Sequence, residues 1–293
     1  MPRRPWRVAA AYFVLLIASH IVDWFIPKSA PPTDLRFVSV HTVDHGGLQP
    51  STIRLAYRDS APDSSQVPIL LVHGSPGSSE VLQKLAELLA SRFRVIVPDL
   101  PGFGASTRDL PDYSFLAHGE YLIELLDALH VPKAQLIGFS MGGGVVLSVA
   151  HLAPGRVAAI VMLSGLGVQE HELTGNYGVN HFLHGAQLAA LWLLRNGFPH
   201  FGLYRKLPFT VEYAQNFYDS DQRPLRAILE QYRGPMLIIH GIHDRNVPIA
   251  AAREHHRLVP QSEVLELDDN HFMAFTHPSV FVDPLVNFLG RTR

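Results

Sequence analysis

The segment 138–142 reads GFSMG and places Ser140 between two glycines, where an apolar run meets a helical pattern. A strand that turns directly into a helix strains the backbone of the central residue, and side chains on the flanking positions would collide. Such a turn exposes the serine hydroxyl and aims the free N–H groups of the following helix toward it. The pattern therefore predicts that Ser140 is a nucleophile. The alternative is a glycine-rich turn used only for close packing.

A serine hydroxyl is a weak nucleophile until a base takes its proton. With a serine in such a turn, the expected chain order is serine, then acid, then histidine. His271 follows the late strand pattern 262–269 and is the candidate base, with His277 as its competitor. Asp244 follows the strand pattern 235–241 and is the candidate acid that orients the base.

The loop 73–77, HGSPG, follows an apolar strand pattern and is the candidate oxyanion loop. The backbone N–H groups of Ser75 and Met141 are expected to bind the oxyanion that forms during acyl transfer. One such donor contributes about 3 kcal/mol to transition-state stabilisation. We expect His73 to shape this loop through hydrogen bonds of its ring, rather than to act as a base or a metal ligand.

Strand and helix patterns alternate through the body of the chain. Most of the strands are continuous apolar runs, which is typical of strands buried on both faces of a parallel sheet. The alternation predicts an α/β fold with a doubly wound, mostly parallel eight-stranded sheet, whose first two strands form an antiparallel pair. The predicted strands are 37–44, 52–60, 67–74, 93–99, 134–140, 157–165, 235–241 and 262–269. The predicted helices are 80–91, 114–130, 141–152, 250–258 and 275–289.

A stretch rich in aromatic and aliphatic residues interrupts this rhythm after the sixth strand. It is longer than a single crossover helix requires. We therefore predict a helical cap over 167–232, inserted into a core formed by 35–166 and 233–293. Residues 1–34 form a separate N-terminal segment and linker.

Residues 1–7 carry three arginines, and a nearly continuous apolar run follows over 8–26. A helix of this length nearly matches a hydrocarbon core about 30 Å thick, and Trp6 and Trp24 flank it as an aromatic belt would. We predict a membrane anchor, with the catalytic domain on the extracytoplasmic side because of the arginines. The alternatives are a signal peptide, cleaved to give a secreted protein, and a packing helix.

Composition restricts the remaining function classes. The 293 residues include no cysteine, which excludes disulfides, thiolate catalysis and cysteine-ligated metals. A formal net charge of −2 disfavours binding to nucleic acid. The histidines lack metal-ligand spacing such as H-E-x-x-H, so neither a metal nor an organic cofactor is expected.

Five segments together resemble the α/β-hydrolase fold superfamily over about residues 36–290. They are HGSPG (73–77), DLPGFGAS (99–106), GFSMGG (138–143), GIHDRNVP (241–248) and DNHF (269–272). The resemblance implies a triad of Ser140, Asp244 and His271, with Ser75 and Met141 as oxyanion donors. Epoxide hydrolases and haloalkane dehalogenases use aspartate as nucleophile, so Ser140 disfavours those activities.

The expected reaction is hydrolysis of a carboxylic ester through an acyl-enzyme. The expected small-molecule substrate is hydrophobic because the predicted cap is apolar. The same triad could instead support amide, C–C bond, acyl-transfer or perhydrolysis chemistry. A hydrolase-like scaffold that only binds a ligand is the remaining alternative, since a fold alone does not establish function.

Overall fold

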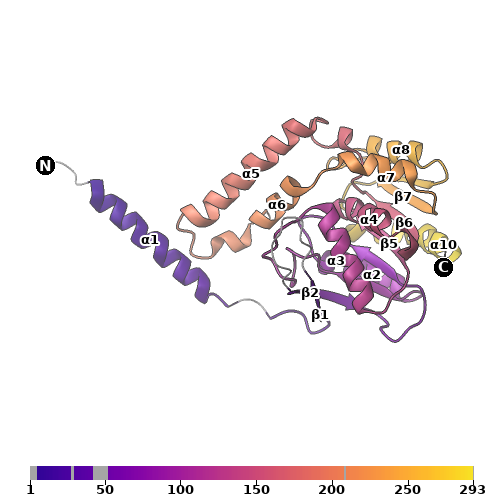
Figure 1. Ribbon diagram of the computed structural model, residues 1–293, viewed down its shortest axis with the longest axis horizontal. Coiled ribbons are helices and arrows are strands. Elements are labelled where there is room, and N and C mark those ends of the chain that lie inside the picture. Colours follow the sequence, from indigo (N-terminus) through magenta and orange to yellow (C-terminus); the bar gives the residue numbers. More distant parts are fainter. Residues whose placement is uncertain (1–4, 28–29, 42–51, 208, 293) are drawn as a thin grey trace.

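The computed structural model describes residues 5–27, 30–41, 52–207 and 209–292. One eight-stranded sheet forms the centre, in the order β1-β2-β4-β3-β5-β6-β7-β8 (Figure 1). The strands are β1 (Arg36–His41), β2 (Thr52–Asp59), β3 (Ile69–Val72), β4 (Val95–Pro98), β5 (Ala134–Phe139), β6 (Val157–Leu163), β7 (Met236–Gly241) and β8 (Glu263–Leu267).

Pairing in the sheet is antiparallel between β1 and β2 and between β2 and β4, and parallel from β4 to β8. The predicted doubly wound, mostly parallel sheet is therefore confirmed, although residues 42–44 of the first predicted strand lie outside the described residues. Every residue of β3 and β5 is buried. Burial on both faces explains why these strands are continuous apolar runs.

Helices cover both faces of the sheet. Those on one face are α3 (Phe115–Ala128), α4 (Met141–Leu152), α7 (Arg223–Gln231) and α8 (Ile249–Leu258), and their apolar side chains form one core with the sheet. Those on the other face are α2 (Gln83–Ala90), α9 (Met273–Thr276) and α10 (Val282–Arg291). Alternate residues along each strand supply the two cores: Ile69 and Leu71 contact one, and Leu70 and Val72 the other.

The segment between β6 and β7 is also mostly helical. Here α5 (Tyr177–Gly197) and α6 (Val211–Asp219) form a hairpin that extends from the sheet toward α1 (Pro5–Phe25) (Figure 1). By contrast, α7 returns to the core, where Leu225 and Leu229 are buried beside α4. Among the described helices, only α1 is long and apolar enough to cross a membrane, a property that an N-terminal signal sequence shares.

The predicted helix over 275–289 is wrong, because the chain forms α9, a short 3₁₀-helix η5 (Pro278–Val280) and then α10. Pro278 has no N–H to donate to the preceding turn, and it disfavours helical geometry at His277. His277 has φ −134° and ψ 44°, which ends α9. Pro284 is tolerated because it lies in the first turn of α10, where N–H groups have no helical partner.

Two fully buried histidines predict a loss of stability in acid. Burial lowers the pKa of His118 to about 3, and burial likewise lowers the pKa of His255 to about 3. Both rings stay neutral in the folded chain, whereas the unfolded chain takes up protons below its ordinary pKa of about 6.5. Their stabilisation is therefore complete above pH 6.5 and is lost progressively as the pH falls toward 3.

Each ring contributes up to about 1.4 kcal/mol per pH unit to the slope of unfolding free energy against pH. We expect His118→Leu to flatten this slope in denaturant unfolding of the detergent-solubilised chain between pH 4.5 and 7.5. The exposed His151 provides the matched control, since His151→Leu should leave the slope unchanged. Equal slopes for the parent and for His118→Leu would show that His118 is not a source of the acid sensitivity.

Candidate active site

Ser140 occupies the turn between β5 and α4 with φ 54° and ψ −120°. A non-glycine residue adopts positive φ only with strain, which the surrounding structure must hold in place. The flanking glycines make the close approach possible. A Cβ on Gly138 would lie 2.4 Å from the carbonyl oxygen of Gly142, and a Cβ on Gly142 would lie 2.6 Å from that of Val72.

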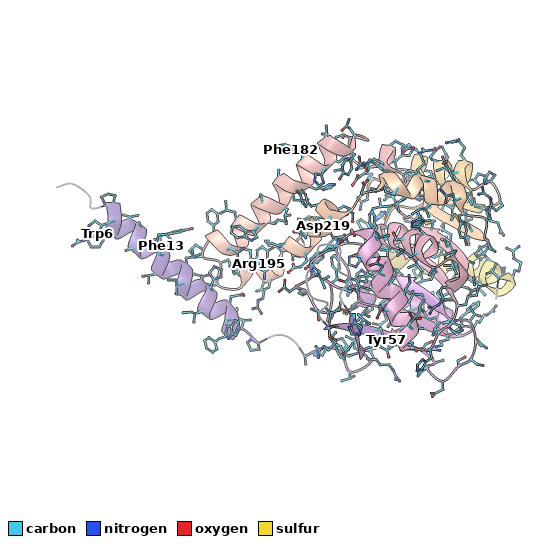
Figure 2. The ribbon with its side chains drawn as sticks, viewed as in Figure 1. Trp6, Phe13, Tyr57, Phe182, Arg195 and Asp219 are labelled. Carbon is cyan, nitrogen blue, oxygen red and sulfur yellow. The ribbon has the colours of Figure 1, made fainter. Side chains whose placement is uncertain are left out.

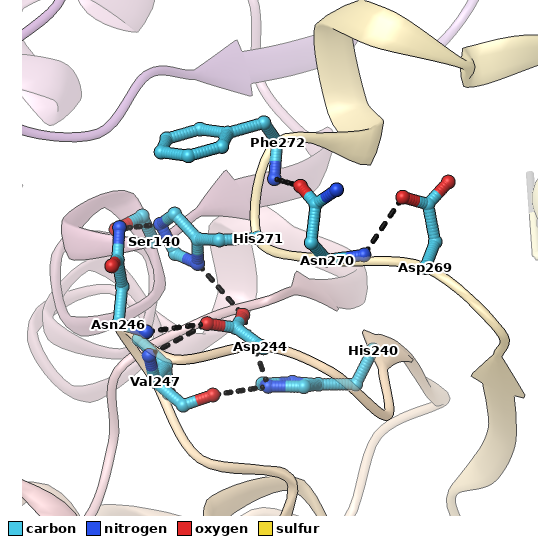
Figure 3. A network of polar contacts seen from close by, with 9 residues as sticks. All are labelled: Ser140, His240, Asp244, Asn246, Val247, Asp269, Asn270, His271 and Phe272. Atoms are coloured by element: carbon cyan, nitrogen blue, oxygen red, sulfur yellow. Dashed lines mark hydrogen bonds and ion pairs between the residues drawn. The ribbon is translucent and has the colours of Figure 1, made fainter.

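The structure brings together Ser140, Asp244 and His271, the three residues that the sequence predicts to act together. The Nε2 atom of His271 lies 3.0 Å from Ser140 Oγ, and its Nδ1 atom lies 2.7 Å from Asp244 Oδ2 (Figure 3). Asp244 follows β7 and His271 follows β8, so the ends of three parallel strands supply the group. The competitor His277 is mostly exposed and pairs with Asp269 at 3.2 Å.

The carboxylate of Asp244 is held by more than the imidazole. Its Oδ1 atom accepts the backbone N–H groups of Asn246 and Val247, both at 2.8 Å (Figure 3). Burial raises the pKa of this carboxyl. The hydrogen bond and charge of His271, together with the Val247 N–H, outweigh burial and leave the pKa below its ordinary value. Asp244 is therefore ionised at neutral pH and orients the imidazole through one oxygen only.

Two further residues support this arrangement. His240 is fully buried, and its Nε2 atom lies 2.8 Å from the Val247 carbonyl oxygen and 3.4 Å from Asp244 Oδ2. It thus ties β7 to the turn that presents the acid. The ring of Phe139 packs on that of His271, with centroids 5.1 Å apart. The position of Phe139 beside the nucleophile was the only sequence signal for that contact.

The loop after β3 passes directly beside the nucleophile. A Cβ on Gly74 would lie 2.8 Å from the Cβ of Ser140, so the backbone that carries Ser75 is in close contact with the turn. Met141 begins α4, where backbone N–H groups lack an intrahelical acceptor. Ser75 and Met141 thus lie on segments that flank Ser140, as the oxyanion prediction requires.

His73 fixes this loop by hydrogen bonds, as predicted. Its Nε2 atom accepts the Leu100 N–H at 2.9 Å, so Nδ1 carries the proton and donates to the Gly74 carbonyl oxygen at 2.7 Å. Burial lowers the pKa of His73, which keeps the ring neutral. The ring therefore links the oxyanion loop to the turn after β4.

We expect Gly74→Ala to impair the reaction more than the fold. The new methyl group must displace either the loop or Ser140, and a displacement of about 1 Å near the reacting atoms lowers the rate about 10²-fold. We therefore expect kcat/KM for a p-nitrophenyl ester to fall by about 10²-fold with little change in melting temperature. Gly155→Ala is the matched control because no atom lies within 4 Å of its added Cβ. Equal activity of both variants would contradict the close approach at Gly74.

Metal ligation finds no support in the described part of the chain, where no group of three or more His, Asp or Glu side chains is placed to hold an ion. A pocket of about 440 Å³ lies between α3, α4 and α7 and is lined by residues such as Ser148, His151 and Leu225. Its lining does not include Ser140, Asp244 or His271.

Fold and site together define the class of the chain. A family model described as "alpha/beta hydrolase fold" matches residues 67–202. The chain belongs to the α/β-hydrolase fold superfamily and is a hydrolase.

Known proteins with similar sequences or folds include a semialdehyde hydrolase and an esterase. An uncharacterized protein of Mycobacterium tuberculosis is 27% identical over 90% of this chain and 83% of its own. A 2-hydroxymuconate semialdehyde hydrolase of Pseudomonas putida is 27% identical over 80% of this chain and 91% of its own. The solved structure of a thermophilic esterase from Thermogutta terrifontis has a TM-score of 0.68 and 24% identity, covering 88% of this chain and 99% of that one. The structural similarity supports the fold alone.

Proposed function

We propose that this hydrolase cleaves a hydrophobic carboxylic ester through an acyl-enzyme on Ser140. The observation that carries the proposal is the continuous hydrogen-bonded series from Ser140 Oγ through His271 to Asp244, with separations of 3.0 Å and 2.7 Å. This series gives the hydroxyl a base and gives the base a fixed orientation, which an active serine nucleophile requires.

In the proposed reaction, His271 Nε2 takes the proton of Ser140 as its Oγ bonds to the ester carbonyl carbon. The backbone N–H groups of Ser75 and Met141 stabilise the oxyanion of the tetrahedral intermediate. The C–O bond to the alcohol then breaks, and the alcohol leaves with the proton from His271. Water attacks the acyl-enzyme with His271 again as base, which releases the acid and restores Ser140.

We further propose that the α5–α6 hairpin, within the predicted cap 167–232, forms a cap that favours apolar substrates, whereas α7 packs in the core. The hairpin of α5 and α6 exposes large apolar side chains, and apolar surfaces bind apolar groups. Those in the first half of α5 include Phe182, at 73%, and Val179, at 47%. A pocket shaped in part by such a segment would discriminate esters by the length of their acyl chain.

The N-terminal helix α1 is proposed to anchor the chain, with the hydrolase on the extracytoplasmic side. Nearly all of its surface is exposed and apolar, as a span in contact with lipid requires. The arginines at positions 3 and 4 precede α1 and Arg7 lies in its first turn, and a basic flank of this kind remains cytoplasmic. A signal sequence shares these features, so an N-terminal sequence of the mature protein is the direct measurement.

The test of the ester proposal is labelling followed by substrate profiling. A fluorophosphonate should modify Ser140, identified by peptide mass spectrometry, and p-nitrophenyl butyrate and octanoate should both be hydrolysed, with the longer ester preferred. Labelling of folded protein at any other residue, or none at all, would reject the nucleophile and favour a scaffold that only binds.

C–C bond hydrolysis, which the same triad could support, is the second candidate, because a relative from P. putida is named 2-hydroxymuconate semialdehyde hydrolase. Labelling at Ser140 without ester hydrolysis, combined with turnover of 2-hydroxymuconate semialdehyde followed by its absorbance, would favour this candidate over the ester.

A further inference from the structure

One face of α1 binds the far end of the α5–α6 hairpin through polar groups. Ser19 is fully buried, and its Oγ atom accepts the backbone N–H groups of His200 and Phe201, both at 2.7 Å. The carboxylate of Asp23 pairs with Arg205 Nε at 2.7 Å, and the same guanidinium donates to the Asp23 carbonyl oxygen at 2.7 Å. These contacts join segments about 180 residues apart in the chain.

More contacts continue along the same face. The hydroxyl of Tyr12 donates to the Gly197 carbonyl oxygen, and His20 Nε2 lies 3.2 Å from the Asn196 carbonyl oxygen. With a rise of about 1.5 Å per residue, Tyr12 lies about 20 Å and Ser19 about 9 Å along the axis from the end of α1 at Phe25. If α1 spans a bilayer, these contacts lie within the thickness of the hydrocarbon core.

These contacts explain how polar residues can occur in an otherwise apolar helix that spans a membrane. A carboxylate or hydroxyl inside a membrane span is costly unless a partner satisfies it. Here the partners of Ser19 and Asp23 come from the hairpin, so the hairpin lowers the cost of placing these two residues in a span. The remaining faces of α1 carry exposed apolar side chains such as Phe13, Val14 and Ile17.

The partner segment is itself apolar on its outer surface. We call residues 192–207 the hairpin tip; Arg195 lies near the end of α5 that approaches α1 (Figure 2). Large exposed apolar side chains crowd this short segment, namely Trp192, Leu193, Leu194, Phe198, Phe201, Leu203 and Leu207. An apolar patch of this kind, continuous with a membrane span, marks a lipid-binding surface. Lys206 is cationic and suits contact with anionic headgroups, whereas Arg195 pairs with Glu212 at 3.3 Å.

We propose that the hairpin tip is embedded in the lipid bilayer against α1, so that the chain enters the membrane with two segments rather than one. The inference rests on the proposed membrane anchor. Ser19 and Asp23 hold the tip beside the span, and the apolar side chains of the tip contact lipid chains instead of water. The partner is therefore the hydrocarbon region of the bilayer, with an anionic headgroup layer next to Lys206.

The absence of cysteine makes a direct test possible, because any introduced thiol is unique. Leu203→Cys, at a residue 63% exposed, is labelled with the fluorophore NBD in the full chain and reconstituted into vesicles of phosphatidylcholine and phosphatidylglycerol. We expect blue-shifted emission that doxyl-labelled lipids quench several-fold. The matched control is Val280→Cys, at a residue 58% exposed on the hydrolase core, which should remain unquenched. Equal emission and quenching at both sites would overturn the proposal.

A charge exchange tests the contact with α1. Asp23→Arg places two cations together and should reduce quenching of the label at residue 203, whereas adding Arg205→Asp should restore it. Failure of the exchange to restore quenching would overturn the role of the pair in holding the tip. Vesicle flotation and ester hydrolysis are measured on the same samples. Loss of flotation rejects the anchor, whereas quenching without hydrolysis leaves the membrane proposal standing and rejects the ester proposal.

Discussion

Replacement of Ser140 by alanine is expected to lower kcat for a p-nitrophenyl ester by about 10⁵- to 10⁶-fold, with the melting temperature nearly unchanged. The variant keeps the backbone N–H groups that flank residue 140, but it removes the oxygen that would form the acyl-enzyme. A residual rate above that of water is expected from binding and oxyanion stabilisation alone. Steady-state assays of the detergent-solubilised chain, with active-site titration of the parent, measure the effect.

A second serine on the same helix provides the matched control. Ser148 is buried in α4, and its hydroxyl donates to the Gly144 carbonyl oxygen at 2.9 Å, within the helix itself. Ser148→Ala should therefore retain the kcat of the parent to within a factor of about two or three. A Ser140→Ala variant that matches Ser148→Ala in rate would remove Ser140 from the mechanism.

The three residues that the structure brings together in the candidate site were predictable because of where they occur along the chain. The ends of parallel strands meet at one edge of a sheet, so Ser140, Asp244 and His271 could be selected from their positions after three predicted strands. The same reasoning separated His271 from His277, which follows it closely in sequence but lies on the other side of the α9 turn in an exposed pair with Asp269.

Contacts between distant segments could not be predicted in this way. The pairing of Asp23 with Arg205 depends on how the hairpin leaves the sheet, and no periodicity in either segment specifies it. The two N–H donors to Asp244 come from backbone groups, which any residue types would provide. The sequence did not predict the break between α9 and α10, because the apolar spacing of a helix continues through Pro278. The proline has no N–H to donate, and this ends the helix despite the apolar spacing.

Asp244→Asn is expected to lower kcat by about 10⁴-fold while the fold stays intact, because the substitution changes the tautomer of His271. Because Oδ1 of Asp244 accepts two backbone N–H groups, the asparagine oxygen is expected to keep that position. The amide nitrogen then faces His271 Nδ1 as a donor, so Nδ1 must accept and the proton moves to Nε2. In that tautomer Nε2 presents a proton to Ser140 Oγ, 3.0 Å away in the parent, and cannot take one.

The matched control for this change is Asp268→Asn, because Asp268 is mostly exposed, its side chain at 87%, and pairs with His243 rather than with His271. It should retain parent activity, since an exposed pair with histidine contributes little. The tautomer is read directly from ¹⁵N chemical shifts of the His271 ring, which should change from an Nδ1–H to an Nε2–H form in Asp244→Asn. A parent-like rate together with an unchanged tautomer would mean that another group orients the base, and His240, 3.4 Å from the same carboxylate, would be the next residue to replace.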